Sequence, residues 1–398
     1  MKLRLCLLLA AISAVLAGTA TSGPARRPRY GGTLRVEIGA TVNSLDPSAG
    51  AATPQEAEAK EQLDALLYGR GQGGADAANG GTAGNGPFRV ASWEAGKRAV
   101  FAANEDYREG WPFVDSIEIE MGRTAHERAL DLELNKTDLA EIPAEQARQA
   151  ADRGMRLSTS RPNELLALVF LKARGAADDA RVREAIARCI DRAAIVNFIL
   201  QKEGEPAGGL LPQWSSGTAF LFATATDASG AKEMPQQIAG SPKLVLGYDS
   251  ADTLEQSVAE RIVVNAKEAG IALMSRAIPA PGTPPVHGTE VLTPRTVHVD
   301  AQLVRLRMPS PVARVSLTAF VRTLGPLAGI ADSPLPQSAS PEDVYYSERS
   351  IMNSGLVVPL VWLPQVYGLS ARVRDWTPPV AGESWPLADV WLEPEDTR

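Results

Sequence analysis

The sequence is poor in the side chains that catalysis and metal binding most often use. Among its 398 residues are two cysteines and three histidines, and no histidine has a second ligand at metal-site spacing. Neither a G-x-S-x-G nucleophile turn nor a G-x-x-x-x-G-K-[ST] phosphate loop occurs. Carboxylates are plentiful, but on an acidic protein most of them are solvated surface charges. We therefore predict no catalytic residue, no metal site and no cofactor.

Positive charge is slightly outweighed by negative charge, with 40 Lys and Arg against 47 Asp and Glu. The formal net charge is −7, and no run of Lys and Arg suggests a nucleic-acid partner. An apolar run occurs at the start, where Lys2 and Arg4 precede residues 5–17 and small residues follow at 18–20. This order predicts a secretory signal peptide over residues 1–20, with a buried helix as the alternative. Its removal would leave Cys189 as the sole cysteine, so an intramolecular disulfide is excluded.

Glycine is concentrated in residues 69–86, which hold eight glycines and few apolar side chains. Such a composition predicts a flexible linker. Gly69, Gly71 and Gly74 match G-x-G-x-x-G, but more linker follows where a dinucleotide site needs a helix. We therefore reject a dinucleotide-binding function for this segment.

The rest of the chain has the periodicity of an α/β protein. Alternating apolar residues predict strands at 34–38 and 117–121, and the continuous apolar run 164–171 predicts a buried strand. A β-α-β unit is expected over 243–278. The spacing over 181–200 predicts one helix, whose apolar face would contain Val182, Ala185, Ile186, Cys189, Ile190 and Ala193.

Four blocks, in order, resemble the extracellular solute-binding proteins of the dipeptide, oligopeptide and nickel transporter family (family 5). They are "GGTLRVEIGATVNSLDP", "GNGPFRVASWEAGKRAVFAANEDYREGWPFVDSIEIEM", "DARVREAIARCIDRAAIV" and "VVPLVWLPQVYGLSARVRDW". The second and third blocks are the specific ones. The chain departs from the family between the Leu-Asp-Pro turn and the Gly-Pro segment, where residues 48–85 replace a sizeable subdomain.

The resemblance implies a two-lobe periplasmic binding protein fold of the type II kind, with α/β lobes joined by hinge strands. Lobe I is expected over 30–160, lobe II over 161–350, and a return to lobe I over 351–398. The implied function is the periplasmic solute-binding component of an ABC importer, a monomer that delivers a peptide-like or other small solute to an inner-membrane permease. Two alternatives stay open: a degenerate relative acting as a sensor or scaffold, and an exported hydrolase, for which no nucleophile–base pair can be named.

The resemblance also implies four ligand-binding residues. An alignment anchored on Pro311 places Arg307 where peptide-binding members have an Asp that pairs with the peptide amino terminus, and Met308 at the adjoining Tyr. Arg307 would then favour acidic or N-blocked ligands, unless it faces solvent in a slipped alignment. Trp214 is expected to line the cleft, with packing inside its own lobe as the alternative. Leu171 stands where the family often has Asn at the end of a strand.

Overall fold

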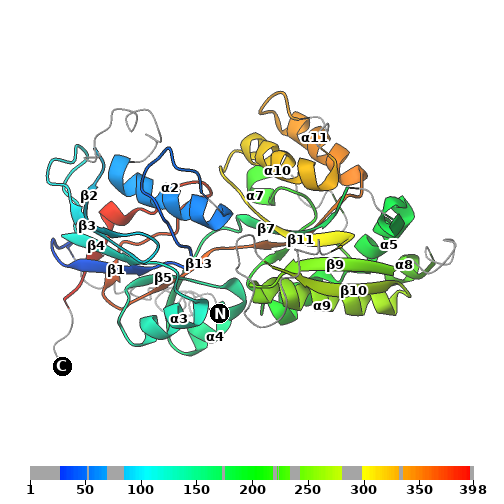
Figure 1. The fold of residues 1–398 in the computed structure, drawn as a ribbon, viewed down its shortest axis with the longest axis horizontal. Coiled ribbons are helices and arrows are strands. Elements are labelled where there is room, and N and C mark those ends of the chain that lie inside the picture. Colours follow the sequence, from blue (N-terminus) through cyan, green and yellow to red (C-terminus); the bar gives the residue numbers. More distant parts are fainter. Residues whose placement is uncertain are drawn as a thin grey trace, which may run out of the picture.

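The computed structural model describes residues 27–51, 53–69, 85–172, 175–217, 222, 224–233, 243–279, 298–330 and 335–394. The predicted signal peptide and most of the Gly-rich segment 69–86 lie outside these residues. The described residues form two α/β lobes that lie side by side, each built around one large sheet (Figure 1).

Lobe I contains a seven-stranded sheet in the order β2-β3-β4-β1-β5-β13-β6, in which β1 runs parallel to β4 and β5. The predicted alternation is confirmed, since Leu34, Val36 and Ile38 are all buried in the core of this lobe. The elements are β1 (Thr33–Glu37), α2 (Pro54–Tyr68), β2 (Phe88–Glu94), β3 (Arg98–Ala103), β4 (Ser116–Glu120), α3 (Ala125–Glu133), β5 (Leu139–Ile142), α4 (Ala144–Asp152), β6 (Arg156–Thr159) and β13 (Val366–Leu369). A small ribbon and a 3-10 turn complete it: β14 (Val373–Arg374), η5 (Leu387–Asp389) and β15 (Trp391–Leu392).

Lobe II contains a six-stranded sheet in the order β10-β9-β11-β7-β12-β8, with helices on both faces (Figure 1). Alternate residues of β7 enter different cores: Leu166 and Leu168 pack on the side of α5 and α9, and Leu165 on the side of α10. This double burial explains the continuous apolar run in the sequence. The elements are β7 (Glu164–Phe170), η2 (Gly175–Asp178), α5 (Ala180–Cys189), α6 (Arg192–Ala194), η3 (Ile195–Ile199), β8 (Glu205–Pro206), α7 (Gln213–Ser216), α8 (Ala228–Glu233), β9 (Lys243–Asp249), α9 (Thr253–Glu268), β10 (Ala272–Ile278), β11 (Ala301–Arg307), α10 (Ala313–Ala328), α11 (Pro341–Asn353) and β12 (Val357–Leu363).

Two neighbouring segments join the lobes: Ser160–Asn163, between β6 and β7, and Pro364–Gln365, between β12 and β13. They are bonded to each other, because the Ser160 amide donates to the Gln365 carbonyl at 2.9 Å and the Asn163 amide donates to the Leu363 carbonyl at 3.0 Å. The antiparallel β6/β13 pair of lobe I thus continues into the β7/β12 pair of lobe II. We call these two segments the hinge.

The sheet membership corrects the boundary expected at residue 351. Strand β12 pairs with β7 in the lobe II sheet, and α11 packs on the same lobe. The chain therefore re-enters lobe I only after Leu363. The apolar residues expected to belong wholly to lobe I therefore contain two strands of different lobes: β12 is part of the lobe II sheet, and β13 is part of the lobe I sheet.

The helix predicted over 181–200 is broken. Ile190 has extended backbone angles (φ −71°, ψ 118°), and Asp191 caps a second helix by accepting from the Ala194 amide at 2.8 Å. Because of this break, Ala193 is exposed, whereas the other five residues of the predicted face are buried. Arg192 turns inward instead and donates to the Pro359 carbonyl at 2.8 Å. Periodicity alone could not reveal the break, since Asp191 acts as an N-cap in the middle of an otherwise regular pattern.

Candidate functional site

Arg307 lies at the last position of β11, where its side chain crosses from lobe II toward lobe I. Its guanidinium bonds to Glu58 of α2, and also lies 3.5 Å from Glu141 of β5 and 3.6 Å from Glu164 of β7. Glu58 and Glu141 belong to lobe I, and Glu164 is the cross-strand neighbour of Arg307. The residue that the sequence singled out therefore sits at the boundary between the lobes, next to the hinge.

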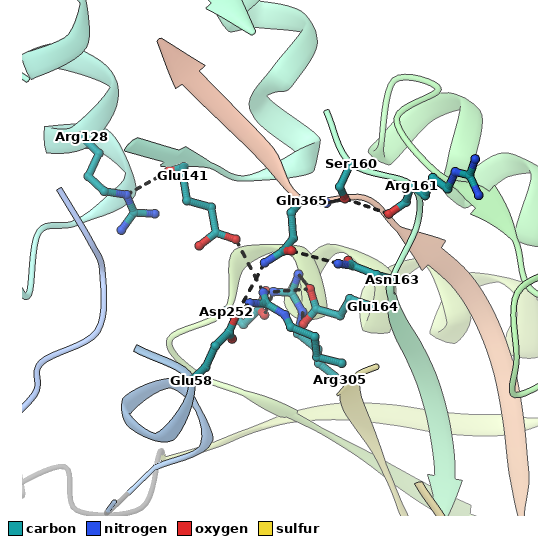
Figure 2. Close-up of polar contacts among 11 residues, drawn as sticks. Glu58, Arg128, Glu141, Ser160, Arg161, Asn163, Glu164, Asp252, Arg305 and Gln365 are labelled. Carbon is teal, nitrogen blue, oxygen red and sulfur yellow. Dashed lines mark hydrogen bonds and ion pairs between the residues drawn. The ribbon is translucent and has the colours of Figure 1, made fainter. Parts of the chain in front are cut away.

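Arg305 adds a second guanidinium to the same group (Figure 2). It lies two residues earlier on β11, so both arginines project from the same face of the strand. Arg305 contacts Glu164 at 3.1 Å and Asp252, the N-cap of α9, at 2.7 Å. Both ion-pair partners of Arg305 thus belong to its own lobe, whereas Arg307 also pairs with Glu58 and Glu141 of lobe I.

The hinge supplies neutral hydrogen-bonding groups to this group of charges. Gln365 donates to Glu58 at 3.5 Å, and its side-chain oxygen accepts from the Asn163 amide group at 2.9 Å (Figure 2). Ser160 accepts from the Gln365 backbone amide at 2.9 Å. Gln365 of one hinge segment thus contacts α2 directly, and Asn163 and Ser160 of the other segment are connected to α2 through Gln365.

Carboxylates outnumber guanidinium groups at this boundary. Although burial opposes its charge, Glu164 and then Asp252 raise the pKa of Arg305. Withdrawal from water raises the pKa of Glu141 and that of Glu145. Burial lowers the pKa of Arg307, which nevertheless remains charged. We name the group the interlobe cluster; its charged members are Arg305, Arg307, Glu58, Glu141, Glu145, Glu164 and Asp252.

Trp214 lies beside the hinge. Its indole N–H donates to the Pro162 carbonyl at 2.8 Å, and the Arg161 guanidinium is 6.0 Å from the ring centroid. The ring packs partly buried against the core of lobe II. This placement combines the expected position near the lobe boundary with packing inside its own lobe, and contact with a ligand stays a prediction.

Met308 and Leu171 are not brought to the interlobe cluster. Met308 is 1% exposed in the lobe II core, because neighbouring residues of a strand point to opposite faces and Arg307 takes the face toward lobe I. Leu171 follows the far end of β7, where its amide donates to the Asp300 carbonyl, whereas Arg307 pairs with Glu164 at the other end. The expectation that these two residues bind ligand with Arg307 is therefore corrected.

Sequence reasoning missed the acidic partners of Arg307. Glu58 occupies a short helix with an ordinary polar pattern, and Glu141 lies in the brief strand "LAEI", where it looks like a solvent-facing residue. One signal existed: the carboxyl ends of parallel strands tend to line binding sites, and Glu141 is next to last in β5. For Glu58 no local signal existed.

The described residues offer neither a metal site nor a membrane-spanning helix. They contain no group of three or more His, Cys, Asp or Glu side chains arranged to hold a metal ion. Likewise, none of their helices has the length and apolar character that crossing a membrane demands.

Residues 36–290, more than half of the chain, match the family model of bacterial extracellular solute-binding proteins, family 5 Middle. Oligopeptide-binding protein AppA of Bacillus subtilis is 26% identical over 125 residues, which cover 31% of this chain and 23% of AppA. Protein XP55 of Streptomyces lividans is 27% identical over 202 residues, covering 47% of this chain and 37% of XP55. The aligned regions thus span well under half of these relatives.

Solved structures share the fold. The ABC transporter substrate-binding protein CtaP of Listeria monocytogenes superposes with a TM-score of 0.70 at 13% identity, covering 92% of this chain and all of that one. The B. subtilis AppA structure, in complex with a nonapeptide, has a TM-score of 0.62 at 12% identity over the same shares of the two chains. At these identities the likeness supports the two-lobe fold.

Proposed function

The chain belongs to family 5 of the bacterial extracellular solute-binding proteins, and from this premise we propose that it is the solute-binding component of an ABC importer. It would capture a peptide-like or other small solute between its lobes and release it to a permease in the inner membrane. The AppA structure with its nonapeptide supports a peptide-like ligand. Delivery by an N-terminal signal peptide over residues 1–20, a periplasmic location, a monomeric state and the lack of enzyme activity are parts of the same proposal.

One observation carries the proposal: charged side chains from both lobes meet beside the hinge. Arg307 of lobe II reaches Glu58 and Glu141 of lobe I, and Gln365 of the hinge contacts Glu58. Rotation about two adjacent strands would separate or join these groups as a unit. A solute bound among them would be enclosed by closure, which is how a binding protein couples capture to a change of shape.

We further propose that Arg307 selects the ligand by charge. A guanidinium can hold a carboxylate with two parallel hydrogen bonds, and it repels an ammonium group. In the structure the Arg307 guanidinium already forms an ion pair with Glu58. An acidic or N-blocked ligand would therefore displace Glu58, and its affinity would be reduced by the strength of the internal ion pair. Trp214 would supply an apolar surface beside it.

A titration calorimetry panel tests the proposal, with succinate, N-acetylated dipeptides, free dipeptides, simple amines and the nickel–histidine complex as probes. We expect binding of at least one acidic or N-blocked probe. Arg307→Gln should weaken that binding at least about ten-fold, since a charge-assisted pair contributes about 1.5–3 kcal/mol. Glu58→Gln should strengthen it, because the internal competitor is removed. Arg322→Gln, an exposed arginine on α10, is the matched control.

The outcomes separate two ways of failing. If a probe binds but the Arg307 and Glu58 variants bind it like the parent, the role of Arg307 is wrong and the capture function stands. If no probe binds the folded protein, the capture function is wrong, and the sensor or scaffold alternative is preferred. The short interval 48–85 is the observation that favours this alternative.

A further inference from the structure

A cavity lies in lobe I, and no member of the interlobe cluster is among its described lining residues. It has a volume of about 330 Å³ and is formed where three stretches of chain meet at the C-terminal half of α2. The stretches are Tyr30, residues 107–113 and residues 384–389, the last including η5, drawn in red beside α2 (Figure 1). Several hydrogen bonds join them: the Gly31 amide donates to Phe113, the Phe113 amide to Ala388, and the Trp385 amide to Gln62 of α2. These hydrogen bonds hold the stretches in place relative to one another and to α2, so the shape of the cavity is fixed by the fold of the lobe.

Five of the described residues that line the cavity are aromatic. Tyr30 lies 5.0 Å from Phe113 and 6.2 Å from Trp111 between ring centroids, and the Tyr30 ring is tilted relative to both. Trp111 is 51% exposed and Tyr30 is 67% exposed, although large rings are normally withdrawn from water. Two further rings complete the wall, so that it contains Tyr30, Tyr107, Trp111, Phe113 and Trp385.

Among the described residues that line the cavity, the charge has one sign. Glu109 and Asp389 line the cavity, and its described lining residues include no Lys, Arg or His. The Tyr107 hydroxyl donates to Glu109 at 2.8 Å, which fixes this carboxylate against the aromatic wall. Ring faces carry negative electrostatic potential, so the rings and the carboxylates attract the same kind of group.

We propose that this cavity binds a small organic cation with an alkylated ammonium group. Its methyl groups would contact the rings, while the Glu109 carboxylate, held on the wall by Tyr107, would balance its charge. A compact metal ion would gain nothing from the rings, and an anion would be repelled. The site is independent of the proposed capture of a solute between the lobes, because all of its lining residues belong to lobe I.

Titration calorimetry with choline chloride tests the proposal on the full chain, with sodium chloride at equal ionic strength as the reference. We expect saturable binding of choline and at least three-fold weaker binding of 3,3-dimethylbutan-1-ol, its uncharged isostere. Trp111→Ala and Glu109→Gln should each weaken choline binding at least about three-fold, the lower range for one cation–π contact or one screened charge. Matched controls are Phe198→Ala, an aromatic residue 80% exposed in lobe II, and Glu105→Gln, an exposed carboxylate outside the wall.

Three results would overturn the proposal. The first is no saturable binding of choline at millimolar concentration. The second is equal binding of the neutral isostere, which would make the cavity an apolar pocket only. The third is choline binding that is lost in Glu58→Gln and kept in Trp111→Ala, which would place the cation between the lobes. If Trp111→Ala does not fold, Glu109→Gln decides, since it changes one exposed carboxylate into an amide of the same shape.

Discussion

At the scale of single residues, Glu348 shows how a buried charge can hold a loop. This side chain of α11 is 2% exposed and accepts from the amides of Leu210 and Leu211 at 2.6 and 3.1 Å. The same loop continues to Trp214, whose indole bonds to the hinge. Burial raises the pKa of Glu348 to about 7, although the two amide bonds oppose that rise. A residue remote from the interlobe cluster therefore fixes a segment that touches the hinge.

The raised pKa of Glu348 predicts a stability effect with a definite sign. Its native pKa of about 7 exceeds the ordinary value of 4.5, so the native state binds the proton more tightly. The contribution of Glu348 to stability is thus complete below pH 4.5 and is lost as the pH rises through 7. Between pH 5.5 and 8, Glu348→Gln should gain about 2 kcal/mol of unfolding free energy relative to the parent. Denaturant titrations at both pH values measure it, with exposed Glu342→Gln as the control, and an unchanged difference between variant and parent would refute it.

Met308 provides a second test at this scale. The side chain fills the core of lobe II, so Met308→Ala should lower the unfolding free energy by about 2–5 kcal/mol, the range for deleting a buried side chain of this size. The affinity for any ligand bound at Arg307 should stay within about two-fold, since the two side chains project from opposite faces of the strand. Calorimetry and denaturant unfolding of the one variant check both parts. A large loss of affinity with unchanged stability would restore Met308 as a ligand contact.

At the scale of elements, local sequence signals worked wherever a segment's neighbours in the chain decide its structure. Thr124 and Glu127 have the spacing of a capping box and form one at the start of α3, and the hairpin turn at 94–97 joins β2 to β3, with Gly96 at φ 68°. The break after Cys189 was missed, because the pattern of apolar residues continues across it. What ends α5 is the Asp191 cap together with the inward path of Arg192 to β12. The contact between Arg192 and the distant Pro359 carbonyl cannot be detected from the spacing of apolar residues around Arg192.

The break makes Asp191 a structural residue, and removing its side chain tests this role. Asp191→Ala deprives the Ala194 amide of its partner at the start of α6, so we expect a loss of about 1 kcal/mol of unfolding free energy. Asp152→Ala, an exposed carboxylate at the end of α4, is the control and should change stability by less than about 0.5 kcal/mol. Equal stability of the two variants in denaturant titrations would show that the cap is not needed for the break.

At the scale of the whole molecule, the family resemblance predicted the two-lobe fold but could not predict which residues make the contacts between the lobes. Arg307 was located by its spacing to Pro311, but its partner Glu58 stands 249 residues earlier in the chain. No local pattern constrains a pair at that separation. The return to lobe I was misplaced for a related reason: both halves of "GLVVPLVWLPQVYGL" are buried strands, and only the pairing of β12 with β7 assigns the first half to lobe II.

The two arginines of the interlobe cluster allow a controlled test of how the lobes are held. Both are on β11, but Arg307 contacts Glu58 and Glu141 of lobe I, whereas Arg305 contacts Glu164 and Asp252 of lobe II. Arg307→Gln leaves carboxylates of both lobes facing one another without their shared cation. We therefore expect the lobes to separate, and the radius of gyration from small-angle X-ray scattering to increase.

Arg305→Gln removes the same charge from the same strand and should increase the radius of gyration less than Arg307→Gln does, because both ion-pair partners of Arg305 belong to lobe II and only its longer-range attraction to Glu145 of lobe I is lost. Raising the salt concentration should move the parent toward the Arg307→Gln value, since ion pairs that are partly exposed are screened by salt. An equal increase in both variants would indicate a general effect of charge on the protein. No increase in either would mean that the hinge and the apolar contacts alone hold the lobes, and that Arg307 is free to exchange Glu58 for a ligand without opening them.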